Sequence, residues 1–493
     1  MGIIIKQSIK GSIWSYFGII IGFVTTSYLF PEYLSPELVG LFGILVAIAT
    51  ITSQLASLGI NGVTGRLFPV FRSNENGHNG YVFLSLMVHL VGFVLFLIFY
   101  FLFKNYLVSS NIEKSPLLAQ YIYLIVPATL FFMAFNFFDT YNKVLYDAVL
   151  GTFLQEFFQR MLIFVVVVLY AFKLISLPQL IVGYVIAISL KSIVLWVYLL
   201  RRGEINLRPN LDFITAKLKK EIIDVALFSV IGGLGSMIVF NIDKIVINQL
   251  LGLEDTGVYT IAFYFGTLVV IPSRPLLKIA GTLIADAFTT NDLGKINEIY
   301  YKSCLNQFII GGFLFLGIWA NIDNILYMLG PDYAQSKWVI FFIGIGYLFD
   351  MLTGANGLII RLSEYYRVAF WIILILIGFV VAFLFAFIPI FGIVGAAMAI
   401  ALALFLNNLM RYIFLVVKYK MQPFNYKFII IAAFYVAVYL LVKLIPQQSM
   451  IVDLIIRGSV ITLLTAIFVF FVPISDDFIT IRNYLLKTLK KWF

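Results

Sequence analysis

The segments Tyr33–Phe42 (YLSPELVGLF) and Leu250–Tyr259 (LLGLEDTGVY) match each other, and each leads into a long apolar run. The match aligns Gly40 with Gly257. A repeat of this kind, at a spacing of roughly 210 to 220 residues, predicts that the chain contains two copies of one structural unit.

Fourteen apolar stretches are each long enough to cross a bilayer, which takes about 20 mostly apolar residues. The chain is 62% hydrophobic and only 12% charged, with a mean hydropathy of +1.02. Charged residues make up about a quarter of soluble domains. We therefore predict an all-α integral membrane protein with about 14 transmembrane helices, at 11–30, 38–60, 81–103, 121–138, 152–172, 178–200, 222–242, 252–273, 303–320, 336–353, 366–388, 392–417, 427–446 and 452–473.

The starts of the sixth and twelfth stretches also match, as LIVGY at 180–184 and GIVGA at 392–396. Helices one to six therefore repeat as seven to twelve. Because six is an even number, both copies begin on the same side, as in the parallel repeats of several secondary transporters. We predict an N-terminal lobe at 1–205, a C-terminal lobe at 206–420, and a trailing helix pair with a cytoplasmic tail at 421–493.

Lys and Arg concentrate at the two ends of the chain and in every second gap between the apolar stretches. The positive-inside rule then places both termini in the cytoplasm. The net charge of +10 is explained by topology and by lipid headgroup contact, so nucleic-acid binding is not expected. The largest basic cluster lies between helices six and seven and comprises Arg201, Arg202, Arg208, Lys217, Lys219 and Lys220.

The gaps between the apolar stretches are short, and they leave no room for a soluble domain. Membrane polymerases and ligases usually carry a sizeable outer loop for their chemistry, so we expect no enzyme. Cys304 is the single cysteine, which excludes an intramolecular disulfide. No C-x-x-C or H-E-x-x-H motif and no cluster of His is present to hold a metal, so no cofactor is expected.

Two cations lie inside predicted spans, where a charge costs at least about 2.5 kcal/mol and marks a candidate functional residue. Arg160 and Lys191 both lie about 12 to 14 Å from the predicted cytoplasmic face. Glu156 is one helical turn from Arg160 and can pair with it. Arg160 is therefore open to a structural or a substrate-binding role, whereas Lys191 has no acidic neighbour in sequence and is favoured as a lining residue of a substrate cavity.

Arg66 and Arg274 follow helices two and eight, which are repeat partners. Glycines before Arg66 and prolines around Arg274 predict irregular backbone at both places. Arg binds phosphate in a bidentate manner better than Lys does. We predict that this pair contacts a diphosphate near the cytoplasmic mouth; the alternative is that both are topology anchors.

Asp243 and Lys244 close the seventh predicted helix. They are expected to pair with each other or to lie at the outer interface. A role in binding a coupling ion is the alternative, as it is for Glu156.

Three segments resemble the bacterial polysaccharide flippases: FNIDKIVINQLLGLEDTGVYT at 240–260, ILYMLGPDY at 325–333 and IFGIVGAAMA at 390–399. With the fourteen-helix layout, the chain resembles the polysaccharide transporter family (Wzx-type O-antigen flippases) of the multidrug/oligosaccharidyl-lipid/polysaccharide (MOP) exporter superfamily. That resemblance implies two six-helix lobes in a V shape plus the trailing pair. Arg66 and Arg274 match by position the cavity arginines of the related lipid II flippases.

The resemblance also implies a substrate and a location. The substrate is an oligosaccharide linked through diphosphate to a polyprenol of the undecaprenyl type. It passes from the cytoplasmic to the outer leaflet of the bacterial inner membrane by alternating access, for O-antigen, capsule or exopolysaccharide synthesis. A polysaccharide polymerase and chain-length proteins are the partners implied.

Two alternatives remain open. A cation-coupled multidrug exporter of the same superfamily needs an acidic site within the membrane, and helix 11–30 has no charged residue at all. The same helix departs from the lipid II flippases, which carry arginines there. A polymerase or ligase enzyme would need a large outer loop.

Overall fold

The computed structural model describes residues 3–73, 75–210, 212–480 and 482. Within these ranges the chain is helical and contains no strand, which confirms the predicted all-α fold. Contacts divide it into two compact units, 1–260 and 261–493, which are described separately. The boundary differs from the predicted lobe boundary at residue 205, because α11 (Ala216–Leu250) and the start of α12 (Leu253–Thr267) pack with the first unit. The division into lobes follows the sequence repeat and stays a prediction, and the tail at 483–493 lies outside the described residues.

Among the described residues, ten helices are long and apolar enough to cross a membrane, and the number is thirteen if each of three bent helix pairs is counted as one span. α18 (Tyr366–Tyr419) has 54 residues and would be about 80 Å long if straight, against a hydrocarbon core of about 30 Å. It contains a non-helical residue, Gly392, with φ 58° and ψ −140°. Division there gives segments 366–391 and 393–419, which overlap the two predicted helices 366–388 and 392–417. The number of fourteen spans stays a prediction. The chain is a multi-pass membrane protein.

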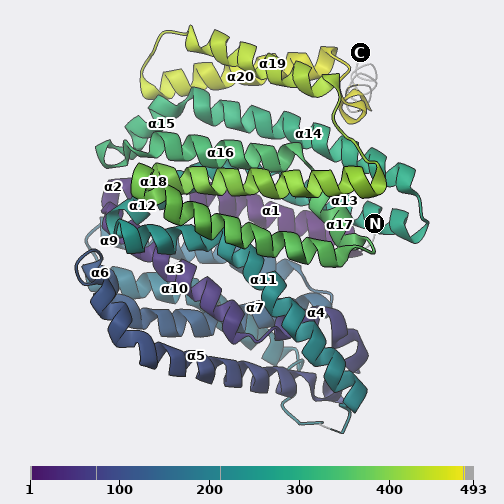
Figure 1. Ribbon diagram of the computed structural model, residues 1–493. Helices are drawn as coiled ribbons and strands as arrows, with labels where there is room; N and C mark the ends of the chain where they lie inside the picture. The colour runs from purple at the N-terminus through teal and green to yellow at the C-terminus, as the bar shows by residue number, and fades with distance from the viewer. Residues whose placement is uncertain (1–2, 74, 211, 481, 483–493) are drawn as a thin grey trace. The chain divides into compact units, whose positions relative to one another are not determined.

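The first unit is built around α3, which packs against α7 and α11 (Figure 1). Two π-helical segments interrupt its helices, at Thr25–Leu29 (η1) and Phe153–Phe158 (η4). Its α-helices are α1 (Ile3–Val24), α2 (Phe30–Tyr33), α3 (Pro36–Ala56), α4 (Ile60–Phe71), α5 (Tyr81–Asn111), α6 (Pro116–Tyr121), α7 (Ile125–Val144), α8 (Val149–Thr152), α9 (Gln159–Ala171), α10 (Leu177–Arg201), α11 (Ala216–Leu250) and the start of α12 (Leu253–Thr267).

In the second unit, α16 packs between α14 and α18, and the trailing pair α19 and α20 lies along α14 (Figure 1). Gly312 of α14 makes room for the ring of Tyr435, whose hydroxyl donates to the Ile309 carbonyl at 2.5 Å. Cys304 is completely buried in the same core. The remaining helices are α13 (Ser273–Thr289), α14 (Leu293–Ala320), α15 (Ile322–Leu329), α16 (Ser336–Leu352), α17 (Asn356–Leu362), α19 (Tyr426–Lys443) and α20 (Met450–Phe471).

Both predicted irregular segments are present. α3 ends at Ala56, and the chain passes through Leu58 (φ 47°) and Gly59 (φ 78°) before α4 begins. In the repeat partner, the helix of Leu253–Val270 meets α13 at a 43° bend. The predicted second and eighth helices therefore continue beyond a break, which places Arg66 and Arg274 on helices and not in loops.

Candidate functional site

The π-helix η4 carries Glu156 and Gln155, and Arg160 follows it in the first turn of α9. π-Helical turns widen the helix locally and are frequent at functional sites. α1 lies directly against η4 through two glycines: a Cβ on Gly18 would lie 1.9 Å from the Glu156 carbonyl oxygen, and a Cβ on Gly22 would lie 3.1 Å from Arg160 Cδ. The sequence Gly18-Ile-Ile-Ile-Gly22 is a G-x-x-x-G pattern, typical of close helix packing in membranes. From the sequence, this pattern could have predicted the close contact between α1 and η4.

The predicted pairing of Glu156 with Arg160 is present, with Oε2 and Nη2 2.9 Å apart. Both side chains are partly exposed, at 23% and 29%. The ion pair neutralises two charges that would each be costly alone in hydrocarbon. It also means that the carboxylate already has a cationic partner in this conformation.

Lys191 of α10 is more enclosed than its sequence suggested, with only 4% of its surface exposed. Its Nζ donates to Gln155 Oε1 of η4. The ammonium also lies 4.4 Å and 5.1 Å from the ring centres of Phe135 and Phe132 on α7, a cation–π arrangement that stabilises a desolvated cation. The amide of Gln155, 36 residues away in sequence, is the partner that sequence analysis missed.

Arg66 and Arg274 are exposed on their helices. Around Arg66 the surface is open, since a Cβ added at Gly65 would meet nothing within 4 Å. Arg66 is the seventh residue of α4, whereas Arg274 is the second residue of α13. The two arginines therefore differ by about 7.5 Å in their distance from the helix start. They belong to different units, so their joint action on one ligand stays a prediction.

Asp243 of α11 is completely buried and held by fixed donors. Its Oδ2 accepts from the Tyr259 hydroxyl at 2.7 Å, and its Oδ1 accepts from the Lys244 backbone N–H at 2.8 Å. The Lys244 ammonium lies 3.9 Å from Oδ1 and donates to the Phe240 carbonyl at 3.2 Å. The predicted pairing is present, and each carboxylate oxygen accepts one hydrogen bond.

A polar contact near the end of α11 was not anticipated from sequence. Ser115 Oγ donates to Asn248 Oδ1 at 2.7 Å, and Asn248 Nδ2 donates to Asn111 Oδ1 at 2.9 Å. Lys114 Nζ adds a bond to the Leu250 carbonyl at 2.9 Å. These bonds join the turn after α5 to the end of α11, and they connect segments of the two predicted lobes.

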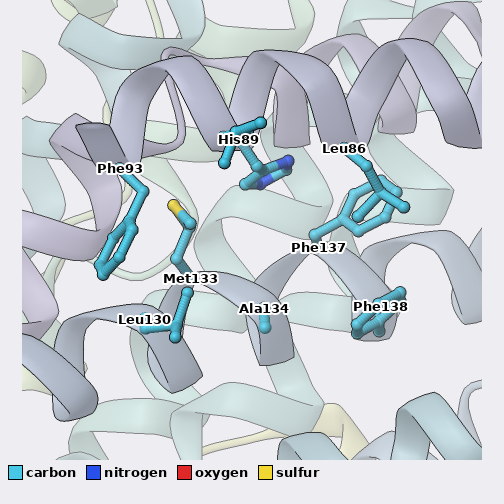
Figure 2. A pocket seen from close by; sticks show the side chains of 9 residues that line it. Leu86, His89, Phe93, Leu130, Met133, Ala134, Phe137 and Phe138 are labelled. Atoms are coloured by element: carbon cyan, nitrogen blue, oxygen red, sulfur yellow. The ribbon is translucent and has the colours of Figure 1, made fainter. Parts of the chain in front are cut away.

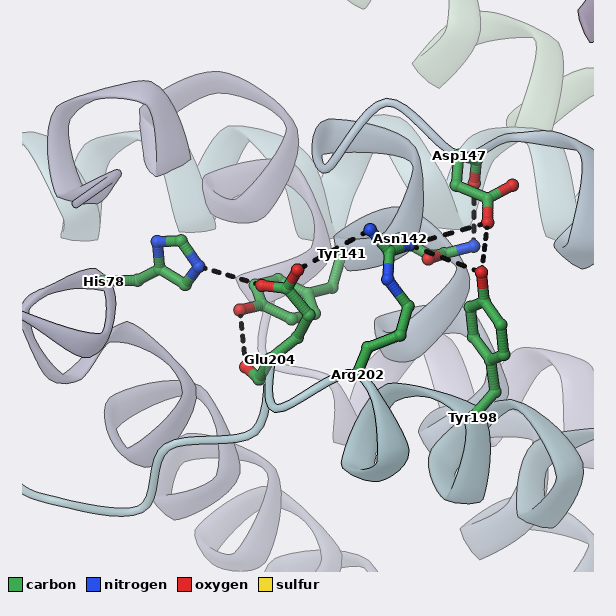
Figure 3. A network of polar contacts seen from close by, with 7 residues as sticks. All are labelled: His78, Tyr141, Asn142, Asp147, Tyr198, Arg202 and Glu204. Carbon is green, nitrogen blue, oxygen red and sulfur yellow. Dashed lines mark hydrogen bonds and ion pairs between the residues drawn. The ribbon is translucent and has the colours of Figure 1, made fainter. Parts of the chain in front are cut away.

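At the other end of the first unit, the linker after α10 is fastened to the helices beside it (Figure 3). Glu204 Oε2 accepts from His78 Nε2 at 3.2 Å, and the Glu204 carbonyl accepts from the Tyr141 hydroxyl at 2.9 Å. Arg202 lies 3.7 Å from both Glu204 and Asp147. The linker between the predicted lobes is thus anchored on the first unit.

Comparison with known proteins places this geometry in context. Residues 7–284 match the family model described as polysaccharide biosynthesis protein. The solved structure of the lipid II flippase MurJ in an inward closed conformation aligns with a TM-score of 0.72 at 15% identity, over 93% of this chain and 98% of that one.

An inward-facing multidrug resistance MATE family transporter of the MOP superfamily aligns with a TM-score of 0.61 at 15% identity, over 81% of this chain and 93% of that one. At these identities both likenesses concern the fold. The search of curated proteins finds no sequence match.

Proposed function

Because the chain belongs to the polysaccharide biosynthesis protein family, within the MOP superfamily, we propose that it is a flippase for polyprenyl-diphosphate-linked oligosaccharide. This family and this fold are those of transporters and flippases and not of enzymes. The observation that carries the proposal is the family match over residues 7–284, more than half of the chain. The substrate would move from the cytoplasmic to the outer leaflet, for O-antigen, capsule or exopolysaccharide synthesis.

The diphosphate of such a lipid carries at least two negative charges, which need compensating cations along a path of low dielectric. In our proposal Arg66 and Arg274 meet the diphosphate first, since both are exposed and guanidinium forms charge-assisted bidentate bonds with phosphate. Arg160 is partly exposed and would act next. Lys191 is enclosed, so it would reach the substrate only after η4 and α7 separate.

The acidic residues are assigned structural roles. Glu156 is bound to Arg160, and Asp243 is bound to Tyr259 and Lys244. A drug exporter coupled to protons or sodium would need one of these carboxylates to be released from its partners. We therefore prefer the flippase and propose no coupling ion.

We further propose that the protein lies in the cytoplasmic membrane of a bacterium with both termini inside, following the distribution of Lys and Arg. The two lobes would open the substrate path alternately to the cytoplasmic and the outer face of the membrane. A polysaccharide polymerase and chain-length proteins would receive the product on the outer side.

Reconstitution in proteoliposomes tests the function. Undecaprenyl diphosphate carrying a fluorescent oligosaccharide is placed in both leaflets, and a membrane-impermeant quencher is added outside. Without protein, roughly half of the fluorescence should resist quenching; with active protein nearly all should be lost. Ethidium transport under an ion gradient, without movement of the lipid, would instead identify a drug exporter.

A further inference from the structure

Two places in the described chain differ in what they offer a ligand. Between α5 and α7, a cavity of about 200 Å³ exposes only apolar atoms, although His89 is one of its lining residues (Figure 2). Such a wall does not select one apolar molecule over another. In the second unit, by contrast, an arginine near the end of α17 and another on α18 present accessible positive charge, and charge does select a ligand.

Arg361 of α17 and Arg411 of α18 meet at Gly357. Arg361 Nε donates to the Gly357 carbonyl at 3.2 Å. The Arg411 guanidinium lies over the open face of the same glycine, where an added Cβ would be 3.0 Å from its Nη1. Given the bond lengths within the glycine, the two nitrogens are no more than about 10 Å apart. Two guanidinium groups at this separation can contact one ligand.

The described residues around these arginines do not balance their charge. Among those residues, no carboxylate lies within 4 Å of either guanidinium, and Arg411 makes no hydrogen bond. Asp350 of α16 attracts the charge of Arg411 from a greater distance, whereas Arg361 repels it. One carboxylate offsets only one of two positive charges. Since Arg411 lies eight residues, or about 12 Å, before the end of α18, the remaining charge is costly within a membrane.

Both guanidinium groups can be reached by a ligand. Arg361 is exposed, and Arg411 is half-buried. The Arg411 nitrogens are not among the fully buried polar atoms that lack a partner, so they retain accessible surface. An anion can therefore approach both side chains without any movement of the helices.

The helices that carry the arginines are held together by buried amides. Asn356 Nδ2 donates to Asn408 Oδ1 at 3.0 Å, and Asn408 Nδ2 donates to Asp350 Oδ1 at 2.9 Å. Both asparagines are only 2% exposed. These bonds join α16, α17 and α18 one residue before Gly357 and one helical turn before Arg411. A ligand would not have to order this backbone, so less of its binding free energy would be lost.

The chemistry of the pair defines the ligand. Guanidinium forms charge-assisted, bidentate bonds with phosphate, and bonds of about 2.8 Å on opposite sides of a phosphate or diphosphate group span such a separation. We propose that Arg361 and Arg411 together bind a phosphate group of a lipid. Two sources supply this chemistry, the headgroup of a phospholipid and the diphosphate of a prenyl lipid. Only the second source rests on the proposed flippase function, and neither arginine is one of the cations assigned to the substrate path.

Photolabelling of the purified full-length protein in dodecyl maltoside, a detergent without phosphate, tests the proposal. The probes are diazirine-bearing phosphatidylglycerol and farnesyl diphosphate, each paired with its phosphate-free counterpart, diacylglycerol or farnesol. We expect labels within 356–367 and 404–419, with the phosphate-bearing probe favoured roughly tenfold or more, the ratio that one hydrogen bond to a charged group supports. The pair with the larger ratio identifies the source. Labelling includes no transport step, so its failure and a failure of flipping are distinguishable.

Two variants test the arginines themselves. Arg361→Gln and Arg411→Gln each remove one charge and keep a polar side chain, so each should lower labelling by the phosphate-bearing probes roughly tenfold and leave the phosphate-free probes unchanged. Arg361 is exposed, so its replacement does not disturb a packed core. Arg367→Gln removes an exposed cation at the start of α18 and is the matched control. Equal labelling by the two members of each pair in the unmodified protein, or an unchanged preference in both variants, would overturn the proposal.

Discussion

Gly40 of α3 and Gly257 of α12 make the same contact with each other's helix. A Cβ on Gly40 would lie 2.0 Å from the Leu253 carbonyl oxygen and 3.0 Å from Gly257 N. A Cβ on Gly257 would lie 1.8 Å from the Pro36 carbonyl oxygen and 2.9 Å from Gly40 N. Pro36 and Leu253 are also repeat partners. Such reciprocity arises where a two-fold axis passes between two equivalent elements, and it explains why both copies of the repeat carry glycine here.

We therefore expect Gly40→Ala and Gly257→Ala each to destabilise the protein, because the added methyl group meets backbone that cannot move aside. The cost should be about 1–3 kcal/mol, as for other overpacked contacts, measured as a lower melting temperature in detergent. Gly65→Ala is the matched control, since its methyl group meets open space and alanine is favoured in a helix by up to about 1 kcal/mol. Equal effects of all three substitutions would show that the close contact is not what limits stability.

Lys191 should be needed for transport because of its charge and not only for packing. Lys191→Met keeps the length of the side chain and removes the ammonium, so flipping should fall at least tenfold, roughly the effect of losing one charged hydrogen bond. Lys191→Arg should retain part of the activity. Lys143→Met, which removes a cation that is 49% exposed, is the control. Normal flipping by Lys191→Met at normal protein levels would assign Lys191 a purely structural role.

Arg66→Ala and Arg274→Ala should each reduce flipping severely, with lipid-linked precursor accumulating in the cytoplasmic leaflet. If both residues hold one diphosphate, the double variant should be little worse than either single variant. Lysine should not replace either arginine fully, because it lacks the planar fork of donors. Arg367→Ala removes an exposed cation on α18 and should leave flipping unchanged. Additive losses of flipping in the double variant, or full activity of the lysine variants, would show that both arginines serve as topology anchors.

Glu204→Ala should loosen the linker between the predicted lobes. Loss of its contacts with His78 and Arg202 should raise the rate of trypsin cleavage after Arg202 by roughly tenfold, since a hydrogen bond to a charged group contributes about 1.5–3 kcal/mol. The bond from Tyr141 to the Glu204 backbone remains. Asp212→Ala removes an exposed carboxylate from the same linker, and trypsin should cleave this variant at the same rate as the unmodified protein. An unchanged rate for Glu204→Ala would mean that the backbone bond alone holds the linker.

Features that depend on near neighbours in sequence could be predicted. The spans follow from runs of apolar residues, and the Glu156–Arg160 pair follows from the four-residue spacing of a helix. The bond between Gln155 and Lys191 could not be predicted, because it depends on how η4 and α10 pack. The π-helical turn, which places Gln155 there, leaves no periodic signal in a segment this short.

The arginine pair illustrates a limit of repeat matching. The match between the copies is close at Gly40 and Gly257, but the helix breaks that follow lie at different distances from it. After the breaks the register differs, so Arg66 and Arg274 occupy different turns of their helices. Sequence offsets locate equivalent helices more reliably than equivalent side chains.

The complete burial of Cys304 makes the unmodified chain a background for thiol labelling. Maleimides react with accessible thiolates, so this sole cysteine should remain silent in the folded protein. A cysteine introduced into any loop would then report by itself which face of the membrane that loop occupies. The accessibility of each introduced cysteine to maleimide could be followed during transport, without first removing a native thiol from the core.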